Sequence, residues 1–292
     1  MQNVTPVAMA ALGLELVPAV LFACIGERVA SAVQRWPIAL RLSLPALLVA
    51  PYAMVAISTH TFRWTWFALY ALLPVAIAGL LLRAAAADPE QRGDWRDAFI
   101  LLLLGLAFDL RWFDSAWPAG LRALNELFLV DAGLYGFQAI RQLRGVGFDF
   151  HLQWSDWKTG LRELIFFTPI VIALGLALGF IHPHRNLPGI GNALLRWILI
   201  FFFTAVPEEL FFRGWVQNLL EPRVGRRAAL VIASILFGLS HFNKRSAHFN
   251  WRYVLLATIA GIFYGRAWRE QRRIPASTIA HASVDWLWGL WF

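Results

Sequence analysis

The chain lacks most of what marks a soluble or secreted protein. Only 15% of its 292 residues are charged, against about 25% in a typical soluble domain, and 59% are hydrophobic. Its single cysteine, Cys24, excludes an intrachain disulfide and a cysteine metal cluster. The first residues carry no positive charge, so we expect no cleavable signal peptide. These absences favour a chain built to lie in a membrane.

The positive charge of the chain does not indicate nucleic-acid binding. The net charge is +8, but the lysines and arginines are scattered between apolar runs instead of forming one stripe. Loops that face an anionic lipid leaflet explain this pattern better, and the 15 tryptophans are typical of the interfacial belts of membrane proteins. The bilayer is therefore the expected partner, and no nucleic acid is.

Several apolar stretches approach the roughly 20 residues needed to cross a bilayer. The candidate spans are 6–25, 42–58, 64–82, 98–110, 123–140, 163–181, 193–212, 228–242, 253–268 and 275–291. If the N-terminus faces outward, 17 basic residues fall in inside loops and 7 in outside loops, as the positive-inside rule requires. There is no internal repeat. The sequence predicts an all-α, polytopic transmembrane bundle of about 8–10 spans.

Two adjacent carboxylates and an arginine interrupt the seventh apolar stretch, in the run VPEELFFR at 206–213. Ionisable side chains at membrane depth are costly and by default mark function. On a helix Glu209 and Arg213 share a face and can pair, which leaves Glu208 free to bind water. Pro207 suits the first turn of a helix, so we expect a helix to begin or break there.

Two later spans carry further polar groups. His241 ends one apolar helix, one turn after Phe237, and Gly238 between them would allow a close helix approach. In the last span His281 and Asp285 are four residues apart and share a face. Because polar groups in lipid must face each other or a cavity, these three spans are expected to enclose one water-accessible pocket.

A carboxylate with two histidines suits the activation of water, either by a general base or through a metal. Ser240 and Ser283 are possible nucleophiles, but neither is automatically aligned with a histidine. Glu208, His241 and His281 would make a zinc site with an open position, although the His-Glu-x-x-His signature is absent. No cofactor is favoured, and zinc is the alternative.

A purely structural interpretation has to explain every one of these groups. A lone histidine in an apolar helix more often satisfies a backbone carbonyl. Each buried ionisable group, however, carries its own insertion cost of about 2.5–3.5 kcal/mol. This cost disfavours a purely structural role for all of them together. Glu15, in the first span, is expected to pair with a basic residue of another helix, with a second site as the alternative.

Taken together, the motifs resemble those of a known family. Glu-Glu-x-x-x-Arg (208, 209, 213), Phe-x-x-x-His (237, 241) and His-x-x-x-Asp (281, 285) on consecutive apolar spans are similar to the motifs of the CPBP intramembrane proteases. These are the CAAX prenyl endopeptidases and bacteriocin-processing proteins, also called the Abi family. The resemblance covers about 163–292. It implies a protease core at 161–292, preceded by a transmembrane region of unknown role at 1–160.

The resemblance implies a role for each matching residue. Glu208 would be the general base, and His241 would help to hold the attacking water. Glu209 and Arg213 would position that carboxylate, while His281 and the residue at 285 would stabilise the oxyanion. Eukaryotic prenyl-protein enzymes carry Asn where this chain has Asp285. An ionised aspartate cannot donate to an oxyanion, so orienting His281 is its expected role.

The function expected from this resemblance is that of a membrane endopeptidase. It would hydrolyse a peptide bond of a membrane-anchored protein, of the CAAX-like, sorting-signal or bacteriocin-like kind, in a bacterial inner membrane. The alternative is a non-catalytic immunity or scaffold protein, or a transporter. A transporter would place charges in both halves of a repeat, whereas here the motif charges lie in the last third.

Overall fold

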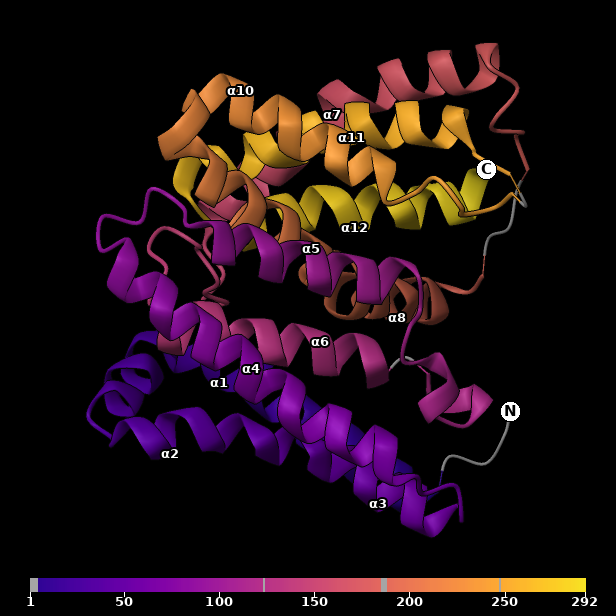
Figure 1. The fold of residues 1–292 in the computed structure, drawn as a ribbon. Helices are drawn as coiled ribbons and strands as arrows, with labels where there is room; N and C mark the ends of the chain where they lie inside the picture. Colours follow the sequence, from indigo (N-terminus) through magenta and orange to yellow (C-terminus); the bar gives the residue numbers. More distant parts are fainter. Residues whose placement is uncertain (1–4, 123, 185–187, 247) are drawn as a thin grey trace. The chain divides into compact units, whose positions relative to one another are not determined.

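The structure is a computed structural model that describes residues 5–122, 124–184, 188–246 and 248–292. These residues form helices and connecting loops without a strand, which confirms the all-α prediction. The chain divides into two compact units, Met1–Arg144 and Gly145–Phe292 (Figure 1). Residue 160, the predicted boundary, lies inside a helix of the second unit. Each unit is described by itself.

The first unit is a bundle of apolar helices joined by short loops. Its elements are α1 (Pro6–Gln34), α2 (Ile38–Ser43), η1 (Leu44–Val49), α3 (Ala50–Ser58), α4 (Trp64–Ala87), α5 (Trp95–Asp109), η2 (Asp114–Ala116), η3 (Ala119–Leu121), α6 (Leu124–Leu134) and η4 (Tyr135–Ile140). Helix α1 packs against α3, α6 and η4, and α4 packs against η1, α5 and α6.

Aromatic rings fill the interior of this unit. Tyr52 on α3 stacks on Tyr70 of α4 with centroids 5.0 Å apart, and Trp117 meets Tyr52 edge to face. Phe128 of α6 completes the cluster, 4.3 Å from Tyr70. Such aromatic pairs add about 0.5–1.5 kcal/mol beyond the burial of their area. They hold α3, α4, α6 and the segment at Trp117 together at this point.

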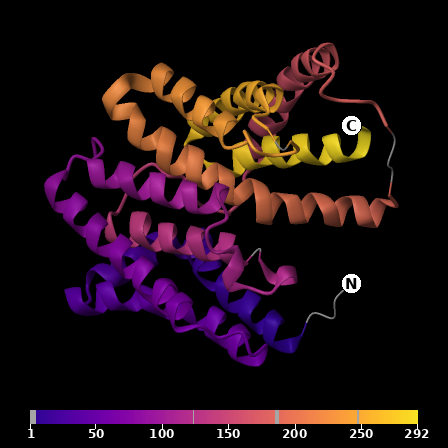
Figure 2. The ribbon, with the colours of Figure 1, turned by 45° about the vertical axis from the view of Figure 1, so that its right-hand side comes forward.

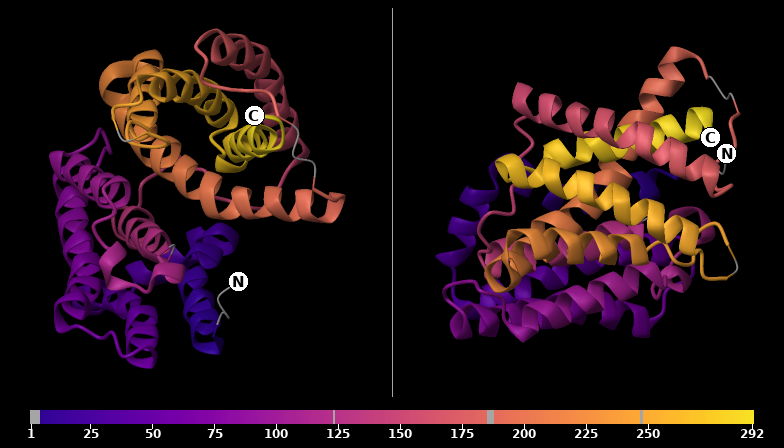
Figure 3. Two further views of the ribbon diagram at one scale, coloured as in Figure 1. Left: turned by 90° about the vertical axis from the view of Figure 1, so that its right-hand side faces the viewer. Right: turned by 90° about the horizontal axis from the view of Figure 1, so that it is seen from above.

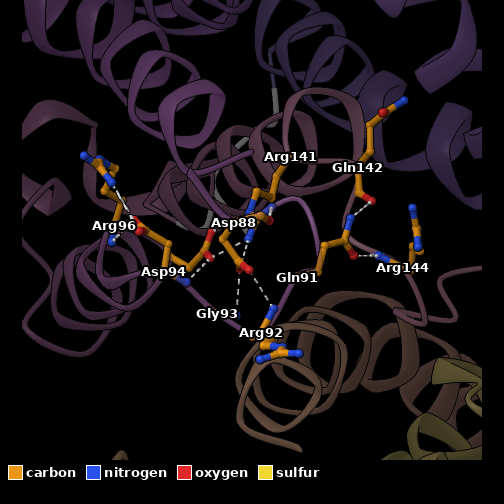
Figure 4. A network of polar contacts seen from close by, with 10 residues as sticks. Asp88, Gln91, Arg92, Gly93, Asp94, Arg96, Arg141, Gln142 and Arg144 are labelled. Carbon is orange, nitrogen blue, oxygen red and sulfur yellow. Dashed lines mark hydrogen bonds and ion pairs between the residues drawn. The ribbon is translucent and has the colours of Figure 1, made fainter. Parts of the chain in front are cut away.

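A buried ion-pair network closes one end of the unit (Figure 4). Arg141, which follows η4, donates from Nε to Asp97 at 3.0 Å and from Nη2 to Asp88 at 2.6 Å. Asp97 also accepts from the backbone N–H of Asp94, forming the capping box that begins α5. One arginine therefore ties together the end of α4, the start of α5 and the end of η4.

Replacing Arg141 by alanine is expected to destabilise the protein by about 3–5 kcal/mol, because the Asp97 carboxylate would stay buried without its cation. The side chains of Arg141 and Asp97 are only 1% and 2% exposed. The measurement is denaturant or thermal unfolding of the purified protein in detergent. Arg96→Ala is the control, since the Arg96–Asp94 pair is partly solvated. Equal losses in the two variants would contradict the prediction.

The second unit is a bundle in which the last helix is central. Its elements are α7 (Trp154–Ala177), α8 (Ile190–Ile200), η5 (Phe201–Ala205), α9 (Val206–Glu209), η6 (Leu210–Gln217), α10 (Asn218–Leu239), α11 (Trp251–Gln271) and α12 (Ile274–Trp291). Helix α12 packs against α7, α8, η5, α9 and α11, so it touches most of the unit (Figure 3).

The helix that carries the two adjacent glutamates departs from the prediction at Pro207. The chain is helical from α8 through η6, and neither a start nor a break occurs at Pro207 (Figure 2). Instead π-helical turns flank α9 on both sides. Proline has no N–H to donate, and widened turns let the helix continue past it. Such π-turns occur frequently at functional sites.

Among the residues that the structure describes, five helical segments are long and apolar enough to cross a bilayer: Pro6–Gln34, Ile38–Ser58, Trp64–Ala87, Trp154–Ala177 and Ile190–Leu239. The last has 50 residues and is interrupted at Gly225, where φ is 80° and ψ is 161°, so it covers two predicted spans. The other predicted spans are also helical, in α5, α6 with η4, α11 and α12. The protein is thus a multi-pass helical membrane protein; its number of spans stays a prediction.

Candidate active site

The second unit brings together all the polar residues singled out in its sequence. Glu208 and Glu209 come from α9, Arg213 from η6, His241 from the turn after α10, and His281 with Asp285 from α12. The close approach expected at Gly238 is confirmed, because a Cβ there would lie 2.6 Å from the carbonyl oxygen of Val254 on α11. This contact brings the end of α10 against α11.

The two glutamates differ in how firmly they are held. Glu209 is completely buried; its Oε1 accepts from His281 Nδ1 at 2.9 Å and its Oε2 lies 3.1 Å from Arg213 Nε. The guanidinium of Arg213 in turn lies over the ring of Phe237 at 4.9 Å. Glu209 therefore serves as a fixed anchor for His281.

Glu208 has no comparable partner among the residues that the structure describes. Its side chain is 12% exposed, and its Oε2 lacks a hydrogen bond. The nearest charged groups are His281 Nε2 and Lys244 Nζ, each 3.9 Å from one carboxylate oxygen. These distances are longer than hydrogen bonds, so this carboxylate can take water as a partner.

His241 is oriented by the backbone of its own helix. Its Nδ1 lies 2.9 Å from the carbonyl oxygen of Phe237. A carbonyl only accepts, so Nδ1 carries the hydrogen and Nε2 is left as an acceptor. The ring packs edge to face on Tyr253, 4.8 Å between centroids. The histidine thus presents a lone pair instead of an N–H.

His281 faces carboxylates from both nitrogens. Nδ1 bonds Glu209, while Nε2 lies 3.6 Å from Asp285 Oδ2 and 3.9 Å from Glu208 Oε2. A carboxylate only accepts hydrogen bonds, so each ring nitrogen of His281 faces an acceptor. His281 is therefore arranged as a donor, the opposite of His241.

Sequence reasoning missed a residue that holds His281. Tyr264 of α11 stacks on its ring with centroids 4.6 Å apart and an interplanar angle of 13°. Ser277, one turn earlier on α12, donates to the carbonyl oxygen of Ile274 instead. Nothing in the sequence of α11 indicates that Tyr264 would meet a histidine.

The start of α12 is fixed by an ion pair to the first turn of α7. Arg273 donates from Nε to Asp156 at 2.8 Å and pairs with Asp149 at 3.2 Å. A Cβ on Gly160 of α7 would lie 2.7 Å from the carbonyl oxygen of Ala276, so the two helices touch through their backbones. His281 follows within two turns, and these contacts limit how far it can move.

An apolar cavity of about 500 Å³ adjoins the cluster. Its polar lining includes Thr168, His184, His241, His281 and Asp285, and most of the rest comes from aliphatic and aromatic side chains of α7, α11 and α12. The two serines considered as nucleophiles are engaged elsewhere. Ser240 donates to the carbonyl of Phe237, and Ser283 accepts from Trp197. Because most of its lining is apolar, the cavity can hold an apolar group beside the ionisable side chains.

The residues proposed as zinc ligands do not fit that role as they lie. Within the described ranges, no three His, Cys, Asp or Glu side chains are placed to hold one metal ion. His281 directs Nδ1 to Glu209, and its Nε2 is 3.9 Å from Glu208. A catalytic zinc ion needs three protein ligands, and these side chains would have to rearrange to supply them.

Comparison with known proteins agrees with this geometry. Residues 190–287 match the family described as Rce1-like, type II CAAX prenyl endopeptidase Rce1-like. This region belongs to the CPBP, or CAAX protease, family. No curated protein and no solved structure matches the chain.

The match supports a CAAX-type intramembrane endopeptidase in general. All six residues predicted for the site lie within the matched region. Helix α7 and the whole first unit lie outside it. The role of each residue, the substrate and the role of the first unit remain predictions.

Proposed function

We propose that this CAAX-type protease hydrolyses a peptide bond of a membrane-anchored protein with a water molecule activated by Glu208. The observation that carries the proposal is the difference between the glutamates. Glu209 has a charged partner at each oxygen, His281 at 2.9 Å and Arg213 at 3.1 Å, whereas the nearest charged groups to Glu208 lie 3.9 Å from its oxygens. A general base needs a free oxygen within reach of its water.

The reaction follows from the donors and acceptors around Glu208. The carboxylate takes a proton from water, and the hydroxyl oxygen attacks the carbonyl carbon of the scissile bond. His241 accepts the second hydrogen of the water at Nε2 and so aims it. As the tetrahedral intermediate collapses, the C–N bond breaks and the proton held by Glu208 passes to the leaving amine.

His281 supplies the charge stabilisation that the attack requires. Its Nε2–H is directed to the side of Glu208 and Asp285, where the carbonyl oxygen of the substrate would develop negative charge. Donors held in place before the reaction stabilise an oxyanion without reorganisation. Glu209, Asp285 and Tyr264 position this imidazole, and in this scheme Asp285 does not donate to the oxyanion.

The chemistry of the cavity indicates what the substrate carries. Apolar side chains from three helices line it, and its polar end holds the two histidines. A peptide whose scissile bond lies beside an apolar side chain or anchor would fit. CAAX-like proteins, sorting signals and bacteriocin-like peptides share that property, and a bacterial inner membrane is the proposed location.

The test uses the full-length protein in lipid nanodiscs with a panel of membrane-anchored peptides of these three kinds. Products are identified by mass spectrometry in oxygen-labelled water, because hydrolysis places the label in the new carboxylate. We expect labelled products from the wild type and none from Glu208→Gln. Products that form equally in both would contradict the proposal, and an inert wild type would favour a scaffold.

Metal removal distinguishes a metal-free mechanism from one that requires zinc. We expect purified protein that is free of zinc by metal analysis to keep its activity, because the glutamate base and both histidines act without a metal. A His241→Ala preparation, analysed alongside, is expected to contain as little zinc as the wild type. Stoichiometric zinc in the wild type that is lost from His241→Ala, together with activity lost on chelation, would contradict this.

A further inference from the structure

The first unit contains two membrane-embedded carboxyl groups that no mechanism of the second unit uses. Glu15 on α1 and Asp131 on α6 are each 1% exposed. Neither oxygen of Glu15 has a hydrogen-bond partner, and neither does Asp131 Oδ2. Helix α1 packs against α6, and the two carboxyls lie close enough for their charges to interact. An ionisable group inside a membrane protein is a functional site by default.

The expected pairing of Glu15 with a basic residue is wrong for the part of the chain that the structure describes, where neither carboxyl forms an ion pair. The charge of Arg41 interacts with Tyr135, and Arg141 forms ion pairs with Asp88 and Asp97. The other charged groups on α1, α4 and α6 near these elements are exposed, namely Glu27, Arg28, Arg83 and Glu126.

A chain of hydrogen-bonded side chains runs from the neighbourhood of this pair to the edge of the unit. Tyr70 of α4 is near enough to Glu15 for an electrostatic interaction, without a hydrogen bond between them. Its hydroxyl donates to Asn125 and accepts from Trp117 Nε1 at 2.6 Å. Asn125 Nδ2 reaches Asp114 at 3.4 Å, on a half-buried turn between helices. Hydrogen bonds therefore extend from the half-buried Asp114 as far as Tyr70.

The local backbone decides which cation can be bound. Helix α6 is regular, and α1 departs from helical geometry only at Ile25, so most backbone carbonyls near the pair are already hydrogen-bonded. Pro18 frees the carbonyl of Leu14 alone. Two carboxylates and one carbonyl fall short of the roughly six oxygens that a hard metal cation requires. A proton needs only two oxygens.

We infer that Glu15 and Asp131 form a proton-binding site inside the first unit, in which at least one of the two carboxyls is held protonated, and that the Tyr70–Asn125–Asp114 chain leads from its neighbourhood to the edge of the unit. Of two neighbouring buried carboxyls without a cation, at least one keeps its proton because both cannot ionise together. The site is separate from the proposed peptidase chemistry and does not depend on it.

The test is thermal unfolding of the full-length protein in detergent at pH values from about 6 to about 9. The folded protein holds a proton that the unfolded chain has released at these pH values, so unfolding releases it and stability falls as pH rises. For one proton the folded-to-unfolded ratio falls about tenfold per pH unit. We expect the wild-type midpoint to fall accordingly, and the Glu15→Gln/Asp131→Asn variant to lose this dependence.

Glu27→Gln is the matched control, since it removes an exposed carboxylate from the same helix and is expected to behave as the wild type. Infrared spectra provide a second measurement if a variant fails to fold. The wild type should show a protonated-carboxyl band at neutral pH that disappears at high pH. A wild-type midpoint independent of pH, the absence of this band, or stabilisation by sodium at constant ionic strength would overturn the proposal.

Discussion

Glu208→Gln is expected to lower the rate of peptide hydrolysis by about 10²–10⁴-fold, the range that a positioned general base contributes. The glutamine side chain has the same shape and fills the same space, but it cannot take a proton from water. Because Glu208 is held by no hydrogen bond on Oε2 and by no contact shorter than 3.9 Å to a charged group, its replacement should leave the unfolding midpoint unchanged.

A loss of activity at an unchanged unfolding midpoint is the result that identifies Glu208 as the base. Glu270→Gln is the control, because Glu270 is a partly exposed glutamate of the same unit that pairs with Arg162; it should keep full activity. A Glu208→Gln protein that retains more than a tenth of the wild-type rate would contradict a role as base. One that unfolds at a much lower temperature would indicate a structural role instead.

Arg213→Ala is expected to cost about 3–5 kcal/mol of stability and to abolish hydrolysis. Arg213 and Glu209 are both completely buried with 3.1 Å between Nε and Oε2, and removing one partner of such a pair leaves an uncompensated charge in the interior. The lost guanidinium also packs on Phe237, so the variant creates a cavity as well. Denaturant unfolding in detergent measures the stability, and the peptide assay measures the rate.

A double variant distinguishes loss of the charge pair from loss of packing. Arg213→Met with Glu209→Gln removes both charges and keeps most of the volume, so its stability should recover toward the wild type. Activity should not recover, because His281 would lose the carboxylate bonded to its Nδ1. Arg92→Ala, which opens a solvent-exposed pair with Glu90, should change little. A double variant no more stable than Arg213→Ala would contradict this account.

The local part of the site could be predicted from spacing alone. Residues four apart on a helix share a face whatever surrounds them, so the Glu209–Arg213 pair and the proximity of His281 to Asp285 followed from the sequence. A different rule, that a proline marks the start or a break of a helix, failed at Pro207, where the chain stays helical. Whether a proline ends a helix or is passed by a π-turn depends on the neighbouring helices, which hold the chain helical.

Long-range partners could not be predicted by any rule of spacing. Glu209 bonds His281 across 72 positions of the chain, and Tyr264 reaches the same imidazole from a third helix. The roles of the two histidines also depend on tertiary structure. A backbone carbonyl receives the Nδ1–H of His241, whereas a buried carboxylate receives that of His281. The sequence shows two histidines and does not distinguish an acceptor from a donor.

By itself the sequence determined the class of the protein, because scarce charge and long apolar runs permit only a helical membrane bundle. It also determined which residues are candidates for chemistry, since each ionisable group in lipid carries its own insertion cost. Tertiary structure alone decided which glutamate is anchored and which is free, and that Glu15 is buried near Asp131 without a hydrogen-bond partner. These outcomes depend on how helices pack, and packing brings together residues that no local pattern relates.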